Sequence, residues 1–178
     1  MKLTEGNLQV DDLDEFLARL DAIGVEHGVA VQAFDARYVA GRDHIRRACE
    51  LADRAFERDD TIARDPAVEL LLYAAGRRQI EDALQMGVSH GEQPAVVVCH
   101  AVGDRQSGTT DDDALEREQA ARDVVETMDN FDPGTTGGAP DPKLIADFFE
   151  ITETERAVTD ATLQALVLER VALLVVEK

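Results

Sequence analysis

The sequence predicts an α+β fold, with a small three- or four-stranded sheet flanked by helices on both faces. Residues 28–34 and 94–102 are apolar on both sides of an alternating pattern, which is typical of strands covered on both faces. Most other segments repeat apolar residues at helical spacing. The elements do not follow a regular strand–helix–strand order, and no repeat divides the chain. We therefore expect residues 1–178 to form one α+β domain.

The first elements are expected to be a strand, a helix and a second strand. Apolar residues alternate weakly over residues 1–10, which indicates a first strand. The acidic residues that follow stabilise the positive end of a helix, with Asp11 or Asp12 as its N-cap. We expect Gly24 to end this helix and the apolar residues 28–34 to form a central strand.

Two helices are expected next. The first, over residues 43–59, has apolar side chains on one face and arginines on the others. The second begins with Asp65 as N-cap and Pro66 at the first helical position. Its apolar pattern continues to Met86 but is interrupted at Gly76, which costs roughly 1 kcal/mol relative to alanine. A glycine at position 87 is expected to end the helix in a left-handed conformation.

The C-terminal half is expected to be mostly helical after the strand at residues 94–102. A polar loop leads to a helix over residues 111–128, whose first turn is acidic. Residues 130–142 read as a loop, and residues 143–149 as a short helix. A last helix begins near residue 159, and its apolar tail is compatible with either helix or strand.

The composition indicates an acidic, salt-adapted protein. The net charge is −19 and arginine far outnumbers lysine, which suits a cytoplasm with very high salt. Such a charge argues against general nucleic-acid binding at low salt. Residues 37–78 are an exception, because nine arginines and eight acidic residues give them a net charge of +1, against −20 elsewhere. No signal-peptide core or membrane span is recognisable, so a cytoplasmic location without membrane contact is expected.

No pattern in the sequence indicates catalysis. The four histidines are scattered without metal partners at helical spacing, and His44 and His100 are interpreted as structural. Cys49 and Cys99 lie in apolar patterns and are expected to be buried and unpaired. The glycine-rich residues 134–138 lack the lysine of a phosphate-binding loop. We therefore expect no catalytic residue, no metal, no cofactor and no small-molecule substrate.

The remaining chemistry lies at Gly76. Arg77 and Arg78 can contact phosphates and stack on unpaired bases, and Gln79 can bond to a base edge. Tyr73, one helical turn earlier, is a further candidate for stacking. This combination suits a single-stranded RNA end better than a duplex.

These residues carry a resemblance to a known family. Residues 69–80 read Glu-Leu-Leu-Leu-Tyr-Ala-Ala-Gly-Arg-Arg-Gln-Ile, and residues 41–45 read Gly-Arg-Asp-His-Ile. Both runs resemble the small kinase-binding subunit of the KEOPS complex, called the PRPK-binding protein family in eukaryotes, and its archaeal branch most closely. The resemblance covers residues 28–102 well and the acidic helix only weakly.

The resemblance implies a non-catalytic subunit in the synthesis of threonylcarbamoyladenosine (t6A) in tRNA. Such a subunit docks on the small kinase/ATPase of the complex and recruits tRNA through its single-stranded CCA end. The implied RNA-contacting residues are Gly76, Arg77, Arg78, Gln79 and, more weakly, Arg42 and His44. The implied kinase-facing residues, placed by element order, are Phe148, Phe149, Leu166 and Arg170.

Two other functions fit the same residues. One is a structural adaptor that regulates the kinase without contacting RNA. The other is a small enzyme that uses aspartate or histidine side chains, although the sequence offers no cluster of such groups. Core packing is also a sufficient explanation for each of the four kinase-facing candidates.

Overall fold

The centre of the molecule is a four-stranded antiparallel sheet with strand order β2-β3-β1-β4. The computed structural model describes residues 1–102, 110–134, 136, 139–159 and 161–175. The strands are β1 (Lys2–Val10), β2 (Ala30–Asp35), β3 (Gly91–His100) and β4 (Phe131–Pro133). The expected strand at residues 94–102 is thus confirmed as β3, which begins and ends slightly earlier.

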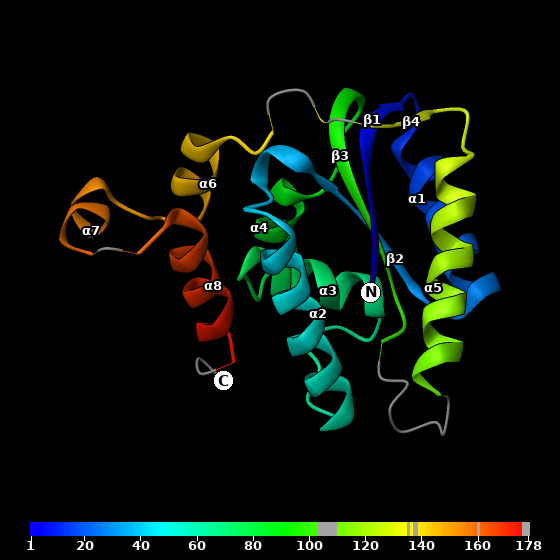
Figure 1. Ribbon diagram of the computed structural model, residues 1–178, viewed down its shortest axis with the longest axis horizontal. Coiled ribbons are helices and arrows are strands. Elements are labelled where there is room, and N and C mark those ends of the chain that lie inside the picture. The colour runs from blue at the N-terminus through cyan, green and yellow to red at the C-terminus, as the bar shows by residue number, and fades with distance from the viewer. Residues whose placement is uncertain (103–109, 135, 137–138, 160, 176–178) are drawn as a thin grey trace.

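Helices cover both faces of this sheet, which confirms the predicted α+β class (Figure 1). One face carries α1 (Leu13–His27) and α5 (Asp111–Glu126), and the other carries α2 (Arg42–Glu57) and α3 (Pro66–Ala75). Short connecting helices are η1 (Ala36–Tyr38), α4 (Ile80–Ala83) and η2 (Leu84–Met86). In Figure 1, α6 (Pro142–Phe148), α7 (Glu153–Val158) and α8 (Leu163–Leu173) form a group beyond α2, away from the sheet.

Strand β3 holds the two layers together because both of its faces are buried. Val96 and Val98 belong to the core under α2 and α3, whereas Val97 and Cys99 belong to the core under α1 and α5. Strand β1 pairs with β3 along its whole length, from Lys2 opposite Cys99 to Val10 opposite Gly91. Burial on both faces explains the unbroken apolar pattern of this segment.

Strand β2 was expected to be central but lies at an edge of the sheet. Its apolar pattern has a different cause, because helices cover both of its faces. Phe34 packs in the core with α2 and α3, while Val31 and Ala33 pack in the core with α1. Helical cover on two faces makes an edge strand as apolar as a central one.

Gly24 and Gly87 differ from their expected roles as left-handed or terminal residues of helices. Helix α1 continues past Gly24 to His27, and Gly28 ends it in a left-handed conformation with φ 64°. A glycine is needed at position 24 because a Cβ atom there would lie 2.7 Å from the carbonyl oxygen of Val29. Gly87 is extended, with φ −75°, and the left-handed glycine of this region is Gly76.

Other boundaries follow the sequence closely. The side chain of Asp12 caps α1, and the side chain of Asp65 accepts hydrogen bonds from the first backbone amides of α3. The expected loop at residues 130–142 contains the short strand β4, and α7 precedes the last helix. The last helix is helical up to Leu173. Residues 103–109 of the expected polar loop, residues 135, 137 and 138 of the glycine-rich run, residue 160 and residues 176–178 lie outside the described residues.

A buried polar cluster joins the two helical layers at one end of β3. The ring nitrogens of His100 lie 2.9 Å from Asp53 of α2 and 3.1 Å from Glu118 of α5. Burial alone would lower the pKa of His100, but the two carboxylates raise it above its usual value overall. Burial alone would raise the pKa of Glu118, but bonds from His100, the Met1 amine and the Ala101 amide hold it at about 2. The expected structural role of His100 agrees with this packing.

Candidate functional site

The expected break at Gly76 is the end of helix α3. Gly76 adopts φ 61° and ψ 32°, the left-handed conformation that glycine favours. Its backbone amide donates to Tyr73, and the amide of Arg77 donates to Leu72 at 3.1 Å. These two bonds form a Schellman motif, which provides partners for carbonyls at the end of a helix. The kinked continuous helix that was expected is thus two helices joined by a defined turn.

Arg77 connects this turn to the end of helix α6. Its Nη2 atom donates to the carbonyl oxygen of Phe148 at 2.7 Å and to Glu150 at 2.9 Å. The guanidinium carbon also lies 5.5 Å from the centre of the Phe148 ring, within range of a cation–π interaction. Arg77 therefore uses much of its bonding capacity inside the protein.

Arg78 and Gln79 follow Arg77 and face the solvent. The side chain of neither residue forms a hydrogen bond or ion pair with any residue that the structure describes. Two apolar side chains, Ile80 and Leu84, are also exposed beside them on α4 and η2. The sequence pattern had placed both in the core, but a four-residue helix buries only one side, and Ala83 occupies it.

Two of the sequence candidates for RNA contact are buried. Tyr73 is almost completely buried, so its ring is not available for stacking on a base. His44 is also buried, and both of its ring nitrogens have partners in the protein. These two residues are therefore corrected from candidate contacts to internal supports. Arg42 is exposed at the first position of α2 and remains available.

The ring of His44 supports the turn from beneath. Its Nδ1 atom accepts from the Ala40 amide at 3.2 Å, and its Nε2 atom donates to the Ala74 carbonyl at 2.8 Å. The ring also packs edge-to-face against Phe149, with 5.5 Å between centroids. Burial lowers the pKa of His44 to about 4, partly opposed by the bond to Ala74, so the ring is neutral at pH 7.

The four kinase-facing candidates lie mostly inside the protein. Phe148, Phe149 and Leu166 are buried in the core, so they are corrected from surface contacts to core residues. Arg170 is partly exposed, but it forms a two-pronged ion pair with Glu155 at 2.8 Å and bonds to the Phe149 carbonyl. Core packing is the correct interpretation of the three apolar residues.

The structure brings the two sets of candidates together. A Cβ atom built on Gly76 would lie 3.6 Å from the carbonyl oxygen of Arg170 and 3.8 Å from the ring of Phe149. Together with the bond from Arg77 to Phe148, these contacts hold the turn against helices α6 and α8. Among the described residues of α6, α7 and α8, the large apolar side chains that face the solvent are Val158 on α7 and Leu173 on α8.

A polar pocket of about 460 Å³ opens beside Arg77. Its lining includes three carboxylates, from Asp82, Asp147 and Glu150, against the single guanidinium of Arg77. Excess negative charge disfavours a phosphate in this pocket, so the exposed side of the turn is the better anion contact.

Within the described residues, no cluster of three or more acidic, histidine or cysteine side chains is arranged for a metal ion. None of the described helices is long and apolar enough to cross a membrane.

We predict that Gly76→Ala destabilises the protein because it forces a Cβ atom into a left-handed conformation. The expected loss in free energy of unfolding is about 1–2 kcal/mol. Gly76→Asn is the matched control, since asparagine tolerates this conformation better. Chemical denaturation of the three proteins measures the effect. Equal stability of the alanine variant and the wild type would show that the turn does not depend on the left-handed residue.

We predict that acid destabilises the protein through His44. The folded pKa is about 4, against about 6.5 in the unfolded chain, so only the unfolded state binds the proton between these values. Stability is therefore complete above pH 6.5 and falls by about 3 kcal/mol towards pH 4. By pH 5 the expected loss is about 2 kcal/mol, which denaturation curves at pH 7 and pH 5 measure, and His44→Gln should remove it. A variant that keeps the full pH dependence would assign the effect to another group.

The turn and the helices around it lie within a segment that matches a known protein family. The model of the family described as kinase binding protein CGI-121 matches residues 9–174. The comparison with curated proteins found none that matches the chain. The family match extends from the end of β1 through α8, so it includes both the turn at Gly76 and the helices on which the turn is seated. The chain therefore belongs to the kinase binding protein CGI-121 family.

Proposed function

We propose that this protein is a non-catalytic, kinase-binding subunit of a KEOPS complex that serves t6A synthesis in tRNA. It docks on the small kinase/ATPase of the complex and recruits tRNA through the single-stranded CCA end. The family match supports the kinase partner. The observation that supports the proposed RNA contact is the turn after α3. Arg78 and Gln79 are exposed there, on a backbone held in place by Gly76 and Arg77.

The form of this turn suits an unpaired RNA end. A guanidinium such as that of Arg78 can stack on a base or bond to a phosphate, and an amide such as that of Gln79 can bond to a base edge. The exposed side chains of Ile80 and Leu84 add apolar surface next to these polar groups. Because Arg77 and Gly76 already hold the backbone, little conformational entropy is lost when RNA binds.

The acidity of the protein is compatible with this proposal in high salt. At molar salt most of the attraction from released counterions is lost, so binding rests on stacking and directed hydrogen bonds. Stacking contributes roughly 1–3 kcal/mol per base. The region around the turn is also the part of the chain with the least negative charge, since residues 37–78 carry a net charge of +1.

For the kinase we propose the outer side of α7 and α8. The candidate residues Phe148, Phe149 and Leu166 are buried and support this surface from inside. Val158 and Leu173 present exposed apolar side chains on the same group of helices. Exposed apolar residues on neighbouring elements are typical of protein–protein contacts.

We predict that Arg78→Ala weakens binding to tRNA by about tenfold, as expected for the loss of one stacking or charge-assisted contact. The free energy of unfolding should stay within about 0.5 kcal/mol of wild type, because Arg78 is exposed. Arg77→Ala, by contrast, should lower the free energy of unfolding by about 1 kcal/mol, since it removes the bonds to Phe148 and Glu150. Arg19→Ala, an exposed arginine on α1 across the sheet, is the control.

Binding is measured at one fixed high salt concentration with intact tRNA and with tRNA that lacks the CCA end. The trimmed tRNA should bind wild type as weakly as intact tRNA binds Arg78→Ala. The adaptor function without RNA contact predicts no effect of trimming. An Arg78→Ala protein that binds both tRNAs like wild type would exclude the turn as the RNA site.

We predict that Leu173→Glu weakens binding to the kinase and leaves the protein folded. Leu166→Ala should instead cost about 2–5 kcal/mol of stability, because it leaves a cavity in the core. Leu115→Glu, at an equally exposed leucine on α5, is the control. Titration with the purified kinase and thermal unfolding separate the two effects. A kinase affinity lowered by Leu115→Glu but not by Leu173→Glu would move the interface to the opposite layer.

A further inference from the structure

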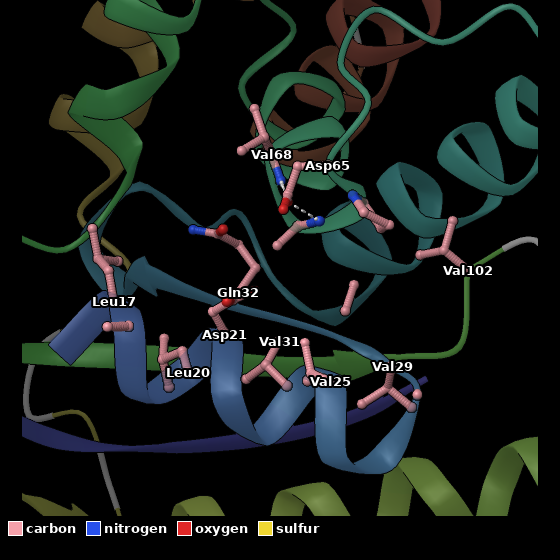
Figure 2. Close-up of a pocket in the computed structure, with 16 residues that line it drawn as sticks. Leu17, Leu20, Asp21, Val25, Val29, Val31, Gln32, Asp65, Val68 and Val102 are labelled. Carbon is pink, nitrogen blue, oxygen red and sulfur yellow. Dashed lines mark hydrogen bonds between the residues drawn. The ribbon is translucent and has the colours of Figure 1, made fainter. Parts of the chain in front are cut away.

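An apolar groove of about 600 Å³ lies at the β2 edge of the sheet, between α1, β2 and the beginning of α3. Figure 2 shows Leu17 and Leu20 of α1 on one side and Val68 of α3 on the other, with Gln32 of β2 between them. Neither the family match nor the turn at Gly76 assigns a role to this groove. Helix α3 has ten residues, so the groove lies about 15 Å along the helix from that turn.

The wall formed by α1 has a regular pattern. Leu17 is 44% exposed and Val25 is 76% exposed, although both are large apolar side chains. Asp21 lies midway between them in sequence, so the three residues follow one another at intervals of four along one side of the helix. The two apolar residues are therefore about 12 Å apart along the helix axis.

The charges of the groove are all negative. Among the described residues that line it, Asp21 and Asp65 are the only charged ones. Asp65 is occupied as the N-cap of α3, with bonds of 2.9 Å to the amides of Ala67 and Val68. Asp21 is exposed and forms no hydrogen bond or ion pair with another residue in the described part of the chain. A second copy of this chain, with a net charge of −19, would be repelled, whereas a basic partner is attracted.

We propose that this groove binds an extended segment of a partner protein that has apolar side chains at positions i and i+4 and a lysine or arginine at i+2. In an extended chain these three side chains lie on one face, and the outer two are about 13 Å apart. This spacing matches Leu17 and Val25, and it places the basic group opposite Asp21.

The probe is the capped peptide Thr-Val-Thr-Arg-Thr-Val-Thr, and its control has glutamate in place of arginine. Both are titrated into the full chain, at the lowest salt that keeps it folded, and followed by chemical-shift changes of backbone amides. The arginine peptide should bind saturably with changes on α1 and β2, and the glutamate peptide should bind at least about tenfold more weakly. Val25→Ser should weaken binding about fivefold. Val158→Ser removes an equally exposed valine, 80% accessible, from α7 and should leave the affinity for both peptides unchanged.

A charge exchange makes the test specific for the groove. Asp21→Lys should lose affinity for the arginine peptide and prefer the glutamate peptide, since the central contact is reversed. The proposal is overturned if the arginine peptide does not bind saturably, or if Val158→Ser weakens it as much as Val25→Ser. Light scattering tests whether the chain forms a dimer. If it does, and Val25→Ser dissociates the dimer, the groove binds a second copy of the chain and the proposal is overturned.

Discussion

The end of helix α3 lies inside the protein, and its last carbonyl groups need partners there. A buried carbonyl without a partner costs as much free energy as a lost hydrogen bond. Three such groups are bonded: Leu72 and Tyr73 through the backbone amides of the turn, and Ala74 through the ring of His44. This requirement determines the left-handed Gly76 and the burial and neutral state of His44.

The same requirement gives the two neighbouring arginines different roles. Because the turn reverses the chain at Gly76, Arg77 is directed at the end of α6, where it bonds to Phe148 and Glu150. Arg78, one residue later, is exposed. A rigid backbone with one internal and one external guanidinium is a preorganised contact, which is the property that the proposed RNA site needs.

The turn and the C-terminal helices also form one structural unit. Gly76 lies against Arg170 and Phe149, and His44 packs on the same Phe149 ring. The proposed RNA contact and the proposed kinase surface are therefore connected through buried side chains. The groove at the β2 edge of the sheet is separate, since it is built from α1, β2 and the opposite end of α3.

Local chemistry was sufficient to predict much of this structure. The acidic N-caps, the helix start at Asp65-Pro66 and the strand with two buried faces were all correct, because each depends on neighbouring residues or on burial. The approximate place of the turn at Gly76 was also recognisable, from a glycine and polar residues within an apolar pattern. The place of a strand within the sheet could not be predicted from local chemistry, as the edge position of β2 shows.

By itself, the sequence determined most of the longer helices and strands, the acidic character of the protein, and the position of the turn. Only the tertiary structure decided which side chains face the solvent. Phe148 and Leu166 are buried while Leu173 is exposed, and Arg77 is bonded while Arg78 is free of described partners. Periodicity identifies an apolar face but not what covers it, because the covering residues come from distant parts of the chain. For the same reason, the partner of Arg77 lies more than seventy residues away, at Phe148 and Glu150.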